Sequence, residues 1–424
     1  MIIDSTQYNG MCACGWEHKM ETVLSVVESG CLKQFEQYAS QLGIHGCRTA
    51  VYDENTYRAT ADRHPTADHE IVLSPVNLHA DEHGVDLLME KLPEDTEILI
   101  AVGSGTVHDI VRYCAYQKGL TFISCPTAAS VDGFCSSVAA MTWHGCKKTL
   151  TAVAPMMVIA DIDIIKNAPI RLARSGFGDM IGKYVALTDW KIASHLTGEF
   201  YCNRIADMTA DATRQVLESA NGIAAGDGAA YTKLMYGLLL SGLAMQMMGN
   251  SRPASGAEHH ISHLIEMHPK SLGVHSDALH GEKVGVGTLL AIREYRAICR
   301  NESIRFQDYS PYSKEQILSV FGEDMAGDIM AENARDAADG ITAERLQDCL
   351  DAIRREILAM PDADTLENVY KALGVKSTLE DIGVPSEIRP ALLDNSPMVR
   401  NRLTFMRLRK CIIKEENHEH AVQR

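Results

Sequence analysis

The chain has 424 residues, of which 46% are hydrophobic and 23% are charged. This length predicts two domains of ordinary size, and the composition excludes a disordered or fibrous protein. Forty basic against 56 acidic side chains give a formal charge of −16, so we expect no nucleic-acid partner. Apolar runs fall short of the roughly 18 residues of a membrane span. The 12 cysteines are scattered and the N-terminus lacks a signal-peptide pattern, so we expect a cytoplasmic protein without membrane insertion.

Residues 1–170 predict an α/β domain with a parallel sheet. Short apolar runs alternate there with helical patterns, as a parallel sheet covered by helices requires. We expect a helix at 107–117 and strands at 49–52, 97–102, 121–124 and 156–160.

A glycine-containing turn, Gly103-Ser104-Gly105-Thr106, joins the strand 97–102 to the helix that follows. Such a turn and a helix N-terminus favour a pyrophosphate. The turn lacks the third glycine of a dinucleotide fingerprint and the lysine of a Walker loop, so an ordinary βα turn is an equal alternative. A second turn, residues 126–133, follows the strand 121–124 at the same predicted sheet edge, where the two turns would form a ligand cleft.

Asp53 follows the strand 49–52, where its carboxylate could accept hydrogen bonds from an adenosine ribose. This placement favours NAD over NADP. A solvated loop carboxylate is an equal alternative.

Residues 171–424 predict an all-α domain, because β-branched runs give way to long patterns rich in Ala, Leu, Met and Glu. We expect helices at 175–196, 203–222, 229–249, 255–267, 278–297 and 342–359. The polar tail contains His418 and His420, for which we expect no biological metal site.

Histidines concentrate in residues 251–287. His259 and His263 lie four residues apart, after Ser251 as a predicted helix cap and Pro253 in the first turn, so both rings would share one helical face. His280 opens the next helical pattern. Two imidazoles and a carboxylate bind Zn, Ni or Fe(II) with positions left open for a substrate oxygen. The alternative is a surface helix that carries histidines without a metal.

Five motifs occur in order over residues 20–300: GSGTVHD, PTAASVDG, SGFGDM, SRPASGAEHH and LHGEKVGVG. Together they resemble the iron-containing alcohol dehydrogenase and dehydroquinate synthase-like superfamily, and within it the bacterial branch of the glycerol-1-phosphate dehydrogenases. The resemblance implies a nucleotide-binding α/β domain, a helical metal-binding domain, an active site between them and a homodimer. It also implies reversible hydride transfer between NAD or NADP and a phosphorylated substrate, reducing dihydroxyacetone phosphate to sn-glycerol 1-phosphate.

The resemblance also assigns roles to individual residues. Asp179, His259 and His280 would bind one divalent metal, and Asp132, Asp179 and His263 would be catalytic and contact the substrate. The cofactor would be held by Asp53, Gly103, Ser104, Gly105, Thr106, Val107, Thr127, Ala128, Ala129, Ser130 and Ser136.

We further expect Arg252 to bind the substrate phosphate, because it stands at the start of the predicted metal-binding helix. Arg400 and Arg402 are rival candidates, and an ordinary salt bridge is an equally good account of each of these two.

Cys12, Cys14 and His18 resemble part of a metal site, and a similar opening occurs in the bacterial branch. Three ligands do not close a structural zinc site, so we favour a hairpin without a metal over a second metal.

The alternatives in the same superfamily are a glycerol dehydrogenase and a dehydroquinate synthase-like enzyme, and the string SRPASGAEH argues against both. A different class of protein is a catalytically retired sensor of nucleotide or metal. The presence of Asp179, His259 and His280 argues against a retired site.

Overall fold

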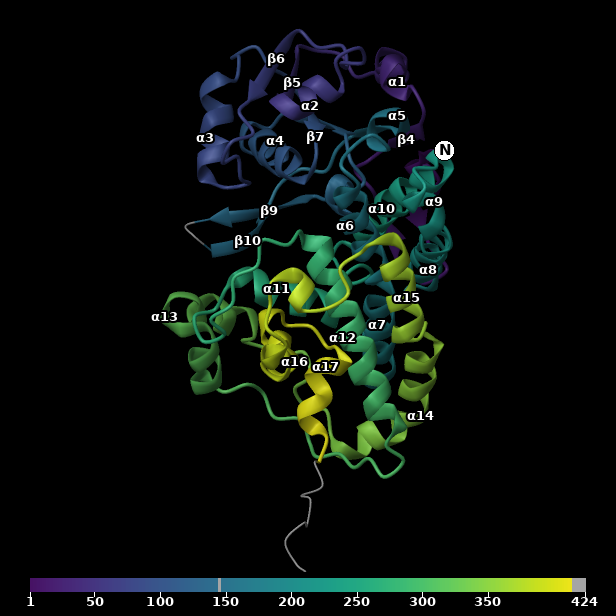
Figure 1. The fold of residues 1–424 in the computed structure, drawn as a ribbon, viewed down its shortest axis with the longest axis vertical. Helices are drawn as coiled ribbons and strands as arrows, with labels where there is room; N and C mark the ends of the chain where they lie inside the picture. Colours follow the sequence, from purple (N-terminus) through teal and green to yellow (C-terminus); the bar gives the residue numbers. More distant parts are fainter. Residues whose placement is uncertain (144–145, 414–424) are drawn as a thin grey trace, which may run out of the picture.

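The computed structural model describes residues 1–143 and 146–413 (Figure 1). The expectation for His418 and His420 lies outside these residues. Within the described ranges, we find no helix that is both long and apolar enough to cross a membrane.

Seven strands form the main sheet in the order β1-β4-β11-β8-β7-β5-β6. The pairs are parallel except β1 with β4, which is antiparallel. The expected parallel sheet and its four predicted strands are confirmed, while β1, β4 and β6 were not predicted. The strand bounds are β1 Ile2–Asp4, β4 Leu24–Glu28, β5 Arg48–Asp53, β6 His69–Leu73, β7 Ile98–Gly103, β8 Thr121–Pro126 and β11 Met157–Asp161.

Helices cover both faces of this sheet, as a buried parallel sheet requires. Alternate residues of β7 point to opposite faces: Ile98 and Ile100 pack with Phe35 of α1, while Leu99 packs with Ile110 of α4. The helices of this part are α1 Phe35–Gln41, α2 Glu54–Ala59, α3 Glu82–Lys91, α4 Gly105–Lys118 and α5 Ile162–Ile165.

Two short antiparallel hairpins leave the main sheet; a hairpin was expected around Cys12, Cys14 and His18, whereas the second hairpin was not predicted. One pairs β2 (Gly10–Met11) with β3 (Glu17–His18). The other pairs β9 (Val138–Trp143) with β10 (Cys146–Thr151) and lies between the sheet and the helices at the left of Figure 1.

From Ile170 to the end of the described chain the named elements are helical, whereas the division into domains at residue 170 stays a prediction. The helix predicted at 175–196 is two helices that meet at Gly182, and the one at 203–222 is also two. The α-helices are α6 Ile170–Ile181, α7 Lys183–Thr197, α8 Asn203–Glu218, α9 Ala220–Ala224, α10 Gly228–Met248, α11 Ala257–Met267, α12 His280–Arg300, α13 Lys314–Glu332, α14 Ala343–Ala359, α15 Ala363–Leu373, α16 Arg389–Asn395 and α17 Phe405–Leu408.

The predicted start of the histidine-bearing helix is wrong. Helix α11 begins at Ala257 with Gly256 as its N-cap, so Ser251 and Pro253 lie in the turn before it. The side chain of Asp189 on α7 accepts a hydrogen bond from Ala257 N at 2.9 Å, which supplies the cap from a distant segment. A local search for capping residues could not reveal this partner.

Helices α6 and α12 pack backbone against backbone. A Cβ atom on Gly281 would lie 2.0 Å from the carbonyl oxygen of Ser175, and one on Gly178 would lie 2.4 Å from the carbonyl oxygen of Gly281. These glycines lie next to Asp179 and His280 in the chain, so the close approach of the two helices sets the positions of both predicted metal ligands.

We expect Gly281→Ala to lower the free energy of unfolding by at least about 1–3 kcal/mol, since the methyl group forces the two backbones apart. Gly327→Ala in α13 is the matched control, because that glycine is exposed and its new Cβ would meet nothing within 4 Å. The control should be neutral or slightly stabilising through helix propensity. Urea unfolding followed by circular dichroism measures both, and equal stabilities would contradict the packing argument.

Candidate active site

The predicted cofactor residues lie at the carboxyl ends of neighbouring strands. Asp53, Gly103 and Pro126 end β5, β7 and β8, which are adjacent in the sheet. Thr127 N donates to the carbonyl oxygen of Gly103 at 2.9 Å, so the two turns are joined directly. This edge of a parallel sheet is where ligands bind in α/β proteins.

The turn after β7 leads straight into α4, with Gly105, Thr106 and Val107 in its first turn. Ser104 is the N-cap residue, but its Oγ pairs with Ser130 Oγ at 3.2 Å instead of capping the helix amides. An N-terminus arranged in this way suits an anion. Packing alone also requires glycine at position 103, because a Cβ atom there would lie 2.6 Å from Val107 Cβ.

The remaining predicted cofactor residues have local partners. Asp53 caps α2, accepting hydrogen bonds from Asn55 N at 2.8 Å and Thr56 N at 2.9 Å. Ser136 Oγ donates to the carbonyl oxygen of Val138 at 2.9 Å. Their assignment to the cofactor therefore stays a prediction, as it does for the three buried or nearly buried residues of the second turn, Thr127, Ala128 and Ala129.

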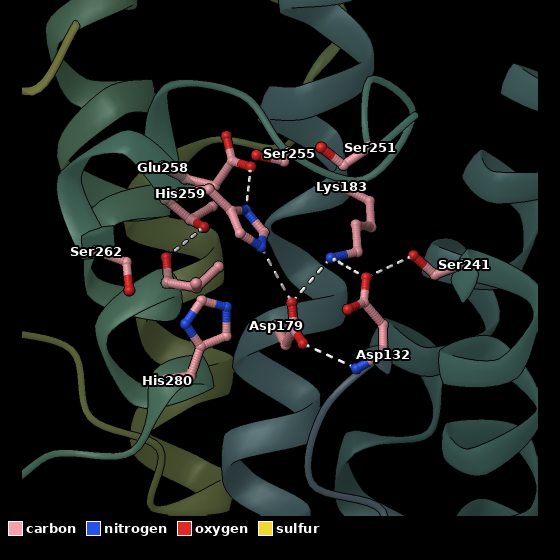
Figure 2. Close-up of polar contacts among 12 residues, drawn as sticks. Asp132, Asp179, Lys183, Ser241, Ser251, Ser255, Glu258, His259, Ser262 and His280 are labelled. Atoms are coloured by element: carbon pink, nitrogen blue, oxygen red, sulfur yellow. Dashed lines mark hydrogen bonds and ion pairs between the residues drawn. The ribbon is translucent and has the colours of Figure 1, made fainter. Parts of the chain in front are cut away.

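Asp179, His259 and His280 converge from three helices, α6, α11 and α12 (Figure 2). One ligand atom from each lies within 4.8 Å of the others. Asp179 Oδ1 is 3.5 Å from His259 Nε2. Asp179 lies about 80 positions before His259 and about 100 positions before His280 in the chain. The close packing of α6 on α12 thus helps to bring these distant residues together.

Each of the two histidines is oriented by its own carboxylate. Glu258 Oε1 lies 2.7 Å from His259 Nδ1, and Glu266 Oε1 lies 2.9 Å from His280 Nδ1. A carboxylate at Nδ1 keeps the ring proton there and leaves the Nε2 lone pair for a metal. Two such imidazoles and one carboxylate fit a divalent Zn, Ni or Fe ion with positions left open.

A buried lysine, which the sequence reasoning missed, joins this cluster to the turn after β8. Lys183 Nζ lies 2.8 Å from Asp179 Oδ1 and 2.9 Å from Asp132 Oδ2. Asp132 N also donates to Asp179 Oδ2 at 3.0 Å, and Ser241 Oγ donates to Asp132 Oδ2 at 2.8 Å (Figure 2). The available signal was the spacing of Asp179 and Lys183, four residues apart on a helical pattern.

The charges of this cluster favour ionised groups despite burial. Burial opposes ionisation of Asp179, yet Lys183 and His259 hold the pKa of its carboxyl well below the usual range. Burial likewise opposes protonation of Lys183, and the carboxylates of Asp132 and Asp179 raise its pKa. Both groups are therefore charged at neutral pH.

His263 lies one helical turn beyond His259 and is partly exposed. Its ring centroid is 5.9 Å from that of His259 and 5.7 Å from that of His280. Burial lowers the pKa of His263 well below the usual value, and this outweighs the carboxylate of Glu266. A neutral imidazole at this point can exchange a hydrogen bond with a substrate hydroxyl.

Arg252 already has protein partners, which argues against the expected phosphate contact, and its assignment to the substrate phosphate stays a prediction. Its side chain is 3% exposed, and the guanidinium donates to Glu199 Oε1 at 2.8 Å and to the carbonyl oxygen of Leu403 at 2.7 Å. A phosphate could bind there only by displacing a buried ion pair. Arg402 is similarly occupied, since it donates to the carbonyl oxygen of Ser255.

A family model described as iron-containing alcohol dehydrogenase matches residues 26–169. A glycerol-1-phosphate dehydrogenase [NAD(P)+] of Bacillus licheniformis is 37% identical over 335 residues, which cover 76% of this chain and 82% of that protein. Another of the same name from Halalkalibacterium halodurans is 36% identical over 307 residues, covering 70% and 76% of the two chains. The chain belongs to the glycerol-1-phosphate dehydrogenase family.

Solved structures support the same fold for this member of the glycerol-1-phosphate dehydrogenase family. A probable glycerol dehydrogenase from Sinorhizobium meliloti superposes with a TM-score of 0.60 at 18% identity, covering 90% of each chain. A sulfoacetaldehyde reductase from Bifidobacterium kashiwanohense, in complex with NAD+, gives a TM-score of 0.59 at 16% identity, covering 92% of this chain and 93% of that one. At these identities the likeness shows the fold alone, and it confirms the expected fold class.

We expect metal affinity at the Asp179, His259 and His280 cluster to rise with pH. Burial and Lys183 oppose protonation of His259, but Asp179 and Glu258 raise its pKa to about 9. Protonation therefore stabilises the metal-free protein fully below the ordinary histidine pKa, and this contribution is lost as pH rises through 9. A metal must displace this proton, so affinity should rise roughly tenfold per pH unit between pH 7 and 9.

Calorimetric titration of the metal-free protein with Ni²⁺ in buffers of different ionisation enthalpy counts the released proton. The His259→Ala variant gives the background from other sites, and Glu258→Gln should flatten the pH dependence because it removes a carboxylate that favours the proton. An affinity that does not change between pH 7 and 8 would refute this account of the cluster.

Proposed function

We propose that this protein reversibly reduces dihydroxyacetone phosphate to sn-glycerol 1-phosphate with NADH or NADPH and one divalent metal ion. The observation that carries the proposal is the set of two carboxylate-oriented histidines and one buried aspartate beside the turns at the carboxyl edge of the sheet. Membership of the glycerol-1-phosphate dehydrogenase family supplies the substrate.

The roles of the chain's own residues follow from their surroundings. Asp179, His259 and His280 would hold the ion, which supplies Lewis-acid polarisation of the substrate oxygen while the nicotinamide carries the hydride. Lys183 keeps Asp179 ionised. Asp132 shares one carboxylate oxygen between Lys183 and Ser241, which leaves the other oxygen to accept a hydrogen bond from a substrate hydroxyl.

His263 is suited to exchanging a proton with the substrate, because its imidazole is neutral and partly open between the two histidine ligands. The turns after β7 and β8 would hold the cofactor pyrophosphate at the N-terminus of α4. Asp53 favours NAD over NADP, and Ser136 would complete the cofactor contacts. A homodimer in the cytoplasm is the assembly and compartment that the sequence expectations support.

We expect metal-reconstituted protein to oxidise NADH with dihydroxyacetone phosphate and far more slowly with unphosphorylated dihydroxyacetone. His259→Ala should abolish turnover because it removes a predicted metal ligand. The decrease in NADH absorbance measures the rate with each ketone and the rate of the variant. A preference for the free ketone would assign the protein to the glycerol dehydrogenases. Absence of NADH oxidation with either ketone, despite NADH binding, would favour a dehydroquinate synthase-like relative or a retired sensor.

In place of Arg252, we propose Arg400 as the residue that selects the phosphate. Its side chain is 39% exposed and donates to Thr149 Oγ1 at 2.9 Å. Its positive charge also contributes to the low pKa of His263, the predicted substrate contact. The ion pair of Arg400 with Glu332 is 4.0 Å long and exposed on both sides, so the guanidinium can pair with a phosphate without breaking a buried ion pair.

We expect Arg400→Gln to raise the Michaelis constant for dihydroxyacetone phosphate by roughly 10- to 100-fold, the value of one hydrogen bond to a charged group, and to leave that for free dihydroxyacetone nearly unchanged. Arg252→Gln is the matched control, which should lower stability and change both substrates alike. A phosphate-selective loss in the Arg252 variant alone would restore the original assignment.

A further inference from the structure

A second cluster of metal-binding side chains lies outside the active site. Cys12, Cys14 and His18 come from the β2–β3 hairpin and the turn within it, and Cys202 is the N-cap residue of α8. One ligand atom from each lies within 4.8 Å of all the others. The sequence reasoning favoured a bare hairpin because it found three ligands, and the fourth lies 184 residues beyond His18.

The spacing of these atoms matches a tetrahedral zinc site. Cys12 Sγ lies 3.9 Å from Cys202 Sγ, and His18 Nε2 lies 3.4 Å from Cys14 Sγ and 3.5 Å from Cys202 Sγ. Zn–S distances of about 2.3 Å and Zn–N distances of about 2.0–2.1 Å give tetrahedral edges of roughly 3.8 Å between sulfurs and roughly 3.6 Å between sulfur and nitrogen. A disulfide would instead need sulfurs about 2.05 Å apart.

The surroundings hold the four side chains toward one point. His18 Nδ1 lies 2.8 Å from the carbonyl oxygen of Met247, so its proton resides there and Nε2 presents its lone pair to the cysteines. Cys12 N donates to the carbonyl oxygen of Trp16, and Gly15, at φ +87°, closes the turn with a hydrogen bond to Cys12.

We propose that Cys12, Cys14, His18 and Cys202 bind a structural zinc ion that joins the N-terminal hairpin to the helical part of the chain. Three thiolates and one imidazole make a closed site for Zn²⁺, without a position for substrate. Other contacts also join the N-terminal segment to the residues around α8: Trp16 stacks on Phe200 with ring centroids 4.1 Å apart, and Arg204 of α8 donates to the carbonyl oxygen of Gln7.

The test counts zinc in protein that cannot hold the active-site metal. The double variant His259→Ala/His280→Ala should retain one equivalent of tightly bound zinc per chain. Adding Cys202→Ser to it should remove that equivalent and lower the midpoint of thermal unfolding. Cys299→Ser, a buried cysteine outside the cluster, should leave the zinc in place. Because the active-site ligands are absent from the start, failure of this site and failure of the proposed function give separate results.

A second measurement does not depend on whether the cysteine variants fold. X-ray absorption at the zinc edge of the double variant should show three sulfur neighbours and one nitrogen neighbour. The proposal would be overturned if the double variant remained free of zinc after metal supplementation. It would also be overturned if the bound zinc had only oxygen and nitrogen neighbours. A Cys12–Cys202 disulfide found by mass spectrometry of the native protein would also overturn it and assign the cluster to thiol chemistry.

Discussion

The ammonium group of Lys183, buried between two carboxylates, is the interaction on which the candidate site depends. It joins Asp132, which follows β8, to Asp179 on α6; the side chains of Lys183 and Asp179 are fully buried and that of Asp132 is 13% exposed. An uncompensated charge at such a place costs about 3–5 kcal/mol, so the turn and the helix are held in one arrangement. The same turn carries the predicted cofactor residues. The predicted metal ligand and the predicted cofactor loop therefore share a fixed relative position.

The sequence predicted the parts of the fold that are specified locally. Strand β7 was found because it is a continuous apolar run, buried on both faces. Strand β6 was missed because it begins with His69 and Glu70, and the β9–β10 hairpin was missed because β10 is polar. The break between α6 and α7 was missed because Gly182 lies there for a tertiary reason: a Cβ would meet Val284 of α12 at 2.8 Å.

The candidate site shows the same division. Asp179, His259 and His280 were located by motifs, since each motif carries its residue within a few positions of the chain. The ion pair of Arg252 was not foreseen because its partners, Glu199 and Leu403, are contributed by segments 53 and 151 residues away. Cys202 was overlooked for the same reason. Whether a charged or ligating side chain is already paired is decided by packing between distant segments, which spacing within one segment cannot reveal.

The docking of the β2–β3 hairpin on α8 has a consequence for how the protein is made. Cys12 and Cys202 are 190 residues apart, so the hairpin leaves the ribosome long before its partner surface exists. At synthesis rates of about 5–20 residues per second, that interval is roughly 10–40 s. During this time the hairpin lacks α8 as a packing partner, and its thiols are open to solvent and to chaperones. The β2–β3 hairpin thus reaches its native contacts with α8 long after its own synthesis.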